Sequence, residues 1–255
     1  MKYKSKKIKY FRSSTFFLGV TIVFIIALIG GIRYVCYEKE VASMPIHSVD
    51  TNDKEIALTF DVAWGKNNID EILQVLEKHN VKSTFFLVGS WIEDNKKLVE
   101  KIHNAGHEIG NHSNTHASFK NLPKESKAQE IKLVSEKIYD ITGEKTSLFR
   151  PPFGDTDKET LEVSNSLDHQ IIKWSLDSMD WKGFGANHVI DRVMKNSEPG
   201  SIVLFHSNVS NVENYIDTII LNLKKDGYKI VPVSEITYKE NFKVDSNGVQ
   251  KLQNK

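Results

Sequence analysis

From residue 54 to about residue 235, the chain alternates short β-branched or aromatic runs with longer segments of helical period. The run EIALTFD at residues 55–61 precedes residues 69–79, where apolar side chains recur at helical spacing, and the run STFFLVG begins at Ser83. This alternation predicts a parallel sheet with right-handed crossovers, either open or closed into a barrel. Because roughly 180 residues are short for an eight-unit barrel, which typically takes about 250, we expect a smaller or incomplete barrel of about seven parallel strands.

The other expected elements follow from the same two periodicities. Helices are predicted at residues 96–105, 124–141, 158–167, 187–195 and 212–226, the second of these ended by Gly143 and the last by Gly227. Strands are predicted for HEIGN, for the segment entering Arg150, and for QIIKWSL, SIVLFH and YKIVPV.

Polar side chains stand where five of these seven strands end. They are Asp61, Asn111 with His112, Arg150, Asp177 with Asp180, and His206. One such residue is usually a cap or a satisfied loop residue, but a parallel fold brings strand ends to one rim, where ligands bind. Five together therefore indicate a functional site at the carboxyl ends of the strands.

His112 and His116 in the segment HSNTH are four residues apart. On a helical turn this spacing places both imidazoles on one face, where they can share a metal ion. By itself the pair is weak evidence, because nine His in 255 residues produce such spacings by chance. Asp61 follows a strand that should be buried, so its carboxylate is either paired with a cation, for which Arg150 is available, or acts as a base.

The N-terminus has the pattern of a membrane anchor. Six basic residues and no acidic one occur in positions 1–12, and residues 13–32 contain no ionisable side chain. At 1.5 Å per residue those twenty residues span a hydrocarbon core of roughly 30 Å, and the preceding basic residues place the N-terminus in the cytoplasm and the rest of the chain outside. An uncleaved single-pass anchor in the cell membrane is favoured over secretion after cleavage near Ser43.

The charge of the rest of the chain argues against nucleic-acid binding. Beyond residue 37, 33 acidic residues face 27 basic ones, whereas nucleic-acid affinity comes largely from cations that neutralise phosphates. The single Cys excludes an internal disulfide and a cysteine-based zinc finger, so His and carboxylate would have to hold any metal. The expected organisation is a basic arm (1–12), an anchor (13–37), a linker (38–53), a catalytic domain (54–236) and a polar tail (237–255).

Five segments, in this order, resemble the motifs of the polysaccharide deacetylases, the NodB-homology domain of carbohydrate esterase family 4. They are TFD ending at Asp61, HSNTH, RPPFG from Arg150, DSMDW from Asp177 and LFH ending at His206. The resemblance covers about residues 54–232. TFDVAWG with an N-terminal anchor is similar to a subgroup associated with sporulation in Gram-positive bacteria.

The resemblance implies a distorted (β/α) barrel that removes N-acetyl groups from amino sugars of a cell-wall polysaccharide such as peptidoglycan. It assigns Asp61 as the general base, His206 as the general acid, Arg150 as the residue orienting the base and Asp180 as the one tuning His206. Trp181 and Leu204 correspond to walls of the acetyl pocket, Phe153 to a position that contributes its backbone N–H to the oxyanion, and His112 and His116 to metal ligands, for zinc or cobalt.

One departure from the family pattern bears on catalysis. The family usually has TFDDG or TFDNG, whose second Asp or Asn is the third metal ligand, and this chain has Val62 there. Two imidazoles alone make a weak metal site. Three alternatives follow from Val62. Another group such as Asp61 completes the metal site, the metal is loosely held, or the protein is a non-catalytic glycan-binding or morphogenetic protein. Trp64 is interpreted as a packed aromatic in preference to a sugar-stacking platform.

Overall fold

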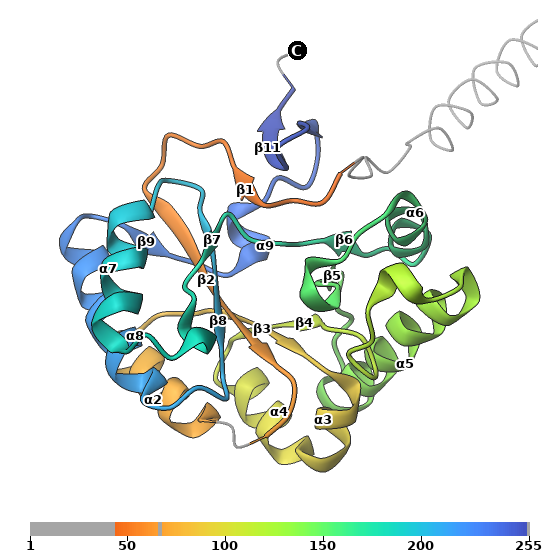
Figure 1. Cartoon of the computed structure of the whole chain (residues 1–255), viewed down its shortest axis with the longest axis horizontal. Helices are drawn as coiled ribbons and strands as arrows, with labels where there is room; N and C mark the ends of the chain where they lie inside the picture. Colours follow the sequence, from red (N-terminus) through yellow and green to blue (C-terminus); the bar gives the residue numbers. More distant parts are fainter. Residues whose placement is uncertain (1–43, 66–67, 254–255) are drawn as a thin grey trace, which may run out of the picture. The chain divides into compact units, whose positions relative to one another are not determined.

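The computed structural model describes residues 44–65 and 68–253, and its centre is a parallel sheet of seven strands (Figure 1). The strand order is β6-β5-β4-β3-β2-β8-β7, and β9 pairs with the start of β2. The bounds are β2 (Glu55–Val62), β3 (Thr84–Leu87), β4 (Glu108–Asn111), β5 (Leu148–Phe149), β6 (Gln170–Ile171), β7 (Leu176–Asp177), β8 (Ile202–His206) and β9 (Lys229–Ile230). The predicted α/β fold with an incomplete barrel of seven parallel strands is confirmed.

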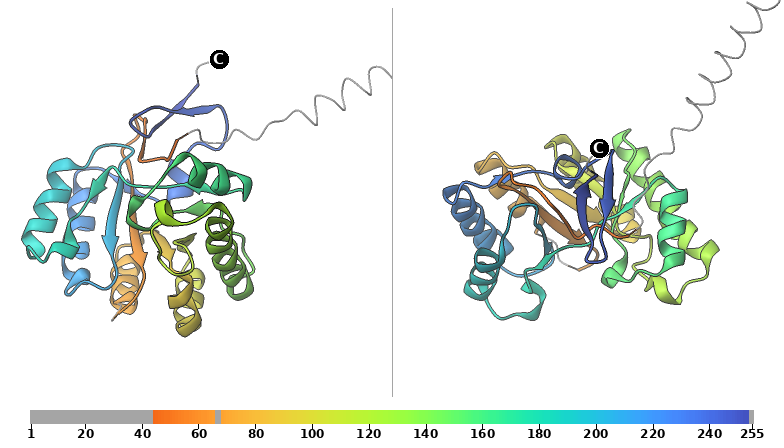
Figure 2. Two further views of the ribbon diagram at one scale, coloured as in Figure 1. Left: turned by 45° about the vertical axis from the view of Figure 1, so that its right-hand side comes forward. Right: turned by 90° about the horizontal axis from the view of Figure 1, so that it is seen from above.

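Helices cover the outer face of the curved sheet (Figures 1 and 2). The longer ones are α2 (Ile69–Lys78), α4 (Lys96–Asn104), α5 (Lys124–Thr142), α6 (Lys158–Ser166), α7 (Ala186–Asn196) and α8 (Val212–Lys225). All six match predicted helices to within one or two residues, and α5 ends at Gly143, whose φ of 74° suits a glycine cap. Shorter helical segments are α3 (Gly89–Asp94), α9 (Val233–Ile236), η1 (Phe119–Asn121), η2 (Pro152–Gly154) and η3 (Asp180–Lys182).

The two faces of β2 have different roles. Side chains of a strand alternate between faces, and Phe60 and Val62 belong to the main apolar cluster together with residues of α2, α4 and α8. Thr59 and Asp61 belong to the opposite row and meet polar groups inside the barrel. The outward-facing side chains of β2 therefore pack against the helices, and the inward-facing side chains can take part in a functional site.

The segment QIIKWSL, which we expected to be one strand, forms two. β6 pairs with β5 at one edge of the sheet and β7 pairs with β8 at the other. The four residues between them cross the open side of the half-barrel, where the carbonyl groups of Ile172 and Lys173 accept hydrogen bonds from Arg150. The crossing segment therefore binds the side chain of Arg150, which follows β5.

Strands also occur in the predicted linker and tail. β1 (Ser48–Val49), β11 (Val249–Leu252) and β10 (Phe242–Val244) form a separate three-stranded sheet in that order. The sheet lies at the end of the barrel where β2 begins, because Val49 N donates to Gly200 O and Gly200 N donates to Glu55 O (Figure 1).

The predicted arm and anchor, residues 1–12 and 13–37, lie outside the described residues. Within residues 44–65 and 68–253, no helix has both the length and the apolar character needed to cross a membrane.

Candidate active site

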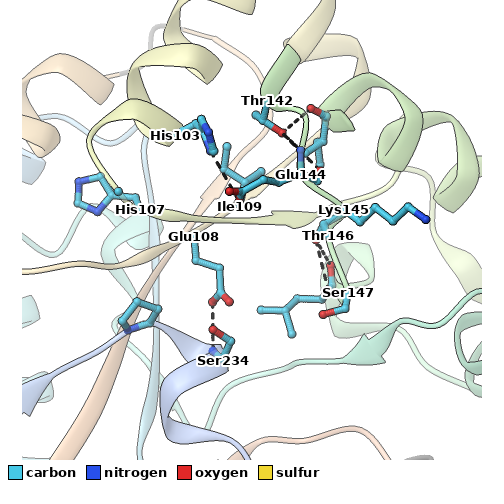
Figure 3. Close-up of a pocket in the computed structure, with 14 residues that line it drawn as sticks. His103, His107, Glu108, Ile109, Thr142, Glu144, Lys145, Thr146, Ser147 and Ser234 are labelled. Carbon is cyan, nitrogen blue, oxygen red and sulfur yellow. Dashed lines mark hydrogen bonds and ion pairs between the residues drawn. The ribbon is translucent and has the colours of Figure 1, made fainter. Parts of the chain in front are cut away.

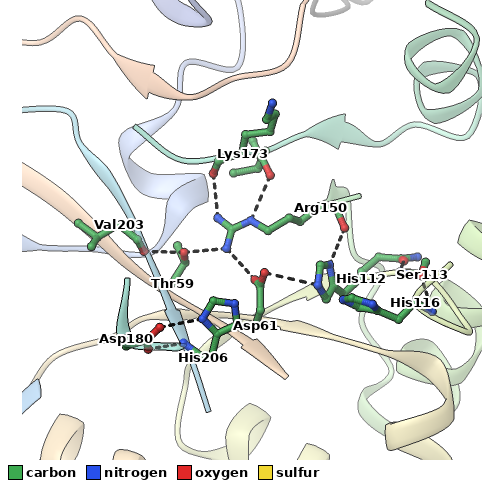
Figure 4. Close-up of polar contacts among 12 residues, drawn as sticks. Thr59, Asp61, His112, Ser113, His116, Arg150, Lys173, Asp180, Val203 and His206 are labelled. Carbon is green, nitrogen blue, oxygen red and sulfur yellow. Dashed lines mark hydrogen bonds and ion pairs between the residues drawn. The ribbon is translucent and has the colours of Figure 1, made fainter. Parts of the chain in front are cut away.

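Strand register places the two predicted acid–base residues side by side. β2 and β8 are neighbouring parallel strands, and Asp61 is paired in register with His206, the last residue of β8. Leu204 is paired with Thr59 and belongs to the same row as His206, so this predicted pocket residue is buried just below the imidazole. The carboxyl ends of two central strands thus bring a carboxylate and an imidazole to one site (Figure 4).

Arg150 holds Asp61 from inside the barrel. Its Nη1 donates to Asp61 Oδ1 at 2.8 Å and to Thr59 Oγ1 at 2.9 Å, and the side chain is fully buried. The guanidinium carbon also lies 4.0 Å from the centre of the Phe86 ring. Burial alone would raise the pKa of Asp61, but His112, Arg150 and His206 offset this and lower the pKa, so Asp61 is a carboxylate at neutral pH.

His112 and His116 meet in a loop, not on the helical turn that their spacing suggested. Ser113 and His116 have left-handed backbones, with φ of 67° and 59°, which helical residues do not adopt. The ring centroids are nevertheless 4.9 Å apart. His112 Nδ1 donates to Arg150 O at 2.6 Å, so its Nε2, 3.4 Å from Asp61 Oδ2, carries the lone pair when the ring is neutral.

Both imidazoles are neutral near pH 7. Burial is the largest cause that lowers the pKa of His112, and burial followed by the proximity of His112 lowers the pKa of His116 to about 4. The Nδ1 atom of His116 is buried and has no hydrogen-bond partner within the described part of the chain. Neutral imidazoles of this kind are able to act as metal ligands.

His206 is prepared as an acid by Asp180. Its Nδ1 donates to Asp180 Oδ1 at 2.8 Å, and its backbone N–H donates to Asp180 Oδ2 at 2.8 Å. Burial would lower the pKa of His206, but the hydrogen bond and charge of Asp180 outweigh it and raise the pKa. The residue before Asp180, Met179, has φ of 58°, a conformation that costs energy in a non-glycine residue and is common where a site fixes geometry.

The remaining predicted site residues lie at the rim. Phe153 and Trp181 are 67% and 55% exposed, and Trp64 is 57% exposed with its ring edge-on to His116 at 4.5 Å. Phe153 also contacts His116 edge-on, with 4.9 Å between ring centroids. Trp64 thus packs against His116 at one edge, while more than half of it is open to solvent.

Two buried partners of the site were missed in the sequence. Thr59 bridges Arg150 and the Val203 carbonyl, and its place two residues before Asp61 on the same strand face was a usable signal. Tyr215, 2% exposed, donates from its hydroxyl to Asp180 Oδ2 at 3.1 Å. It lies on α8 and had no signal, because it occupies an ordinary core position of that helix.

A hollow at the other end of the barrel contains none of these residues. It measures about 430 Å³ and is lined by residues such as His107, Glu108, Glu144 and Ser234, near the starts of β4 and β5 (Figure 3). Since the acid–base groups stand at the opposite ends of the strands, this cavity is separate from the candidate active site.

The parallel half-barrel and the polar groups at its strand ends agree with the comparisons with known proteins. The family model for polysaccharide deacetylases matches residues 48–172. The chain belongs to the polysaccharide deacetylase family, carbohydrate esterase family 4, as predicted.

Several peptidoglycan deacetylases are similar to this chain. The peptidoglycan-N-acetylmuramic acid deacetylase PdaA of Bacillus subtilis is 31% identical over 201 residues, which cover 77% of this chain and 76% of PdaA. A peptidoglycan-N-acetylglucosamine deacetylase of Bacillus cereus is 34% identical over 184 residues, which cover 71% of this chain and 67% of that protein. Among solved structures, BA3943 of Bacillus anthracis, described as a pseudoenzyme of the family, is 35% identical with a TM-score of 0.74, covering 77% of this chain and 69% of its own.

The residues present do not complete the metal site that this family generally has. The neutral rings of His112 and His116, the latter with an unpartnered buried nitrogen, fit two ligands. Val62 is fully buried, ends a regular strand and belongs to the apolar cluster on the outer face of β2. Among the described residues, no group of three or more His, Cys, Asp or Glu side chains is arranged to hold a metal ion. We therefore assign no reaction step to a metal.

Proposed function

We propose that this protein hydrolyses N-acetyl groups of amino sugars in a cell-wall polysaccharide, namely peptidoglycan. The observation that carries the proposal is the pair of oppositely prepared groups on adjacent strands. Arg150 keeps Asp61 ionised, and Asp180 keeps His206 protonated, at positions that the strand register places side by side. Two groups whose environments drive their pKa values apart are the pattern of a general base and a general acid.

Each group has a defined task in amide hydrolysis. Asp61 takes a proton from a water molecule, whose oxygen attacks the acetyl carbon and forms a tetrahedral adduct. When the carbon–nitrogen bond breaks, its electron pair goes to nitrogen, which takes the proton from Nε2 of His206. Nε2 is the available nitrogen because Nδ1 is bound to Asp180. The products are acetate and the free amino sugar.

The test is acetate release from N-acetylated peptidoglycan by the full-length protein. Acetate release that Asp61→Asn and His206→Ala each abolish supports the proposal, and near-wild-type release by either variant contradicts it. A chelator arm separates two forms of the reaction: loss of activity indicates a bound metal despite Val62, and unchanged activity indicates hydrolysis by the acid–base pair alone.

A second function is favoured by Val62 and by the similarity to the B. anthracis pseudoenzyme. In this alternative the protein binds N-acetylated glycan without turnover and acts in cell-wall assembly. Saturable glycan binding with no acetate release, with or without added zinc, would establish it.

We also propose that residues 13–32 hold the protein in the cell membrane with the catalytic domain outside, and that it acts during sporulation. The hexabasic arm and the uncharged run support the first statement. Carbonate-washed membranes should retain the full-length chain, and protease added outside protoplasts should digest the domain. A soluble cytoplasmic product of unchanged mass would contradict the anchor, and synthesis confined to vegetative growth would contradict the role in sporulation.

A further inference from the structure

Residues 46–50, here called the strap, run from the end of β6 to the start of β8 and contain β1 (Figure 1). We propose that the strap is a positioning element of the active site, because it holds the segment whose carbonyl groups bind Arg150. The inference rests on the proposed role of Asp61 as the base, which Arg150 orients. It gives a part in catalysis to a segment that the sequence alone presented as a linker.

Ile46 binds the crossing segment between β6 and β7 with both of its backbone groups. Its N–H donates to Ile171 O at 2.8 Å, and its carbonyl accepts from Lys173 N at 2.7 Å. Arg150 binds the same stretch from inside the barrel, since Nε donates to Ile172 O at 3.2 Å and Nη2 donates to Lys173 O at 2.9 Å. The two carbonyl groups that receive the guanidinium therefore belong to residues that the strap holds by their backbone.

The side chain of Ile46 supports the same place by packing. It is fully buried in an apolar cluster that includes Phe86 and Ile172. The centre of the Phe86 ring lies 4.0 Å from the guanidinium carbon of Arg150. Because protein interiors are close-packed and transmit strain, we expect a void at residue 46 to move both the ring and the carbonyl group that Arg150 contacts.

The C-terminal strand β11 and the turn before it hold the strap from the other side. His47 N donates to Gly248 O and Asp50 N donates to Gln250 O, each at 2.8 Å. Gly248 has φ of 80°, and a Cβ atom placed there would lie 2.4 Å from the His47 ring and 3.0 Å from Pro45 O. A methyl group at residue 248 should therefore displace the strap without touching Arg150.

These contacts form a continuous path from the strap to the base. Arg150 donates four hydrogen bonds, two to the carbonyl groups of the crossing segment and two to Thr59 and Asp61. If the carbonyl groups move, the guanidinium is held less firmly against Asp61. A misplacement of about 1 Å at a catalytic group can lower the rate by up to about 10²-fold. We therefore expect turnover to depend on the strap.

The test follows the Arg150 Nε–H by NMR in the full-length protein in detergent micelles. This resonance reports the bond to Ile172 O and can be measured whether or not the protein is active. Gly248→Ala should shift the resonance and speed its exchange with solvent about tenfold or more. Gly143→Ala is the matched control, because residue 143 has φ of 74° and, within the described part of the chain, no atom lies within 4 Å of a Cβ placed there. It carries similar backbone strain and should leave the resonance unchanged.

A second pair of variants tests the side chain of the strap. Ile46→Ala and Ile102→Ala each remove most of a fully buried side chain, the first from the strap and the second from α4. Both should lower the urea midpoint. Only Ile46→Ala should move the Arg150 resonance and lower kcat about tenfold while KM changes less than about twofold. Ile46→Val should restore most of both.

An unchanged Arg150 resonance in Gly248→Ala and in Ile46→Ala would overturn the positioning role, and so would an equal loss of kcat in each variant and its control. If Gly248→Ala does not fold, Ile46→Ala and Ile46→Val decide the question. Absence of acetate release by the wild type would contradict the proposed function instead. The Arg150 resonance would then still show whether the strap holds the guanidinium.

Discussion

Replacing Arg150 with Met should destabilise the protein strongly, and most strongly at neutral pH. Met is of similar length and apolar, so it fills much of the space but removes four donated hydrogen bonds, to Thr59, Asp61, Ile172 and Lys173. The main cost is the carboxylate of Asp61, which is 8% exposed and would lose its cation. Removing one partner of a buried ion pair typically costs about 3–5 kcal/mol, a large fraction of the roughly 5–15 kcal/mol by which a domain is stable.

The dependence on pH follows from the direction of the Asp61 shift. In the wild type its pKa is lowered, so its contribution to stability is complete above the unfolded-state value of about 3.9 and is lost as the pH falls through the folded-state value. Without Arg150, one of the groups that lower the pKa of Asp61 is lost while burial still acts to raise it, so the pKa of Asp61 is higher in the variant than in the wild type. The variant's deficit should therefore be largest at neutral pH and shrink as the pH falls toward 4.

Urea unfolding followed by tryptophan fluorescence measures the deficit, because all four tryptophans lie between residues 64 and 181. The companion variants are Asp61→Asn and the double variant Asp61→Asn with Arg150→Met. We expect the double variant to lose less than the sum of the single losses, since the stranded charge is then absent. A loss below about 1 kcal/mol for Arg150→Met, or strict additivity, would show that the pair is not the buried interaction described here.

Four single variants test the site. Asp61→Asn and His206→Ala should each lower turnover about 100-fold or more while urea midpoints show that the fold persists; a smaller loss would contradict their roles. Asp180→Asn should lower the pKa of His206, measured by NMR titration, because Asp180 raises that pKa in the wild type. The stabilisation that the wild-type pair contributes is complete below the unfolded-state pKa of about 6.5. It is lost as the pH rises through the higher folded-state pKa. Val62→Asp should tighten zinc binding about tenfold or more and make stability depend on zinc, because an oxygen ligand at the end of β2 joins two imidazoles; unchanged affinity with lowered stability would mean that residue 62 stays in the apolar cluster.

Periodicity and strand-end chemistry predicted most of what positions the site. The helical spacing from residue 69 to residue 79 became α2, because an amphipathic stripe has to be buried against a sheet. Asp61 and His206 met because parallel strands end at one rim, whatever the details of the loops. These predictions depended on rules that act along a single segment or across a whole parallel sheet.

Features set by contacts between distant segments could not be predicted in this way. The break between β6 and β7 lies where two carbonyl groups accept hydrogen bonds from the distant Arg150, and the sequence from residue 170 to residue 176 contains no Gly or Pro that would predict it. β10 and β11 are only three and four residues long, and β11 pairs with β10 on one side and with the distant β1 on the other. The loop geometry of HSNTH depends on left-handed residues other than glycine, which residue type alone does not reveal.

Contacts with protein groups hold the Asp61 carboxylate in place. Whether Asp61 is positioned as a base is therefore separate from whether Val62 leaves the metal site incomplete. One oxygen is fixed by Arg150 and the other faces His112, which is itself fixed by the Arg150 carbonyl. Arg150 thus contacts the carboxylate of Asp61 through its side chain and holds the ring of His112 through its backbone carbonyl. Losing a ligand at position 62, in the outer row of β2, leaves this inner arrangement in place.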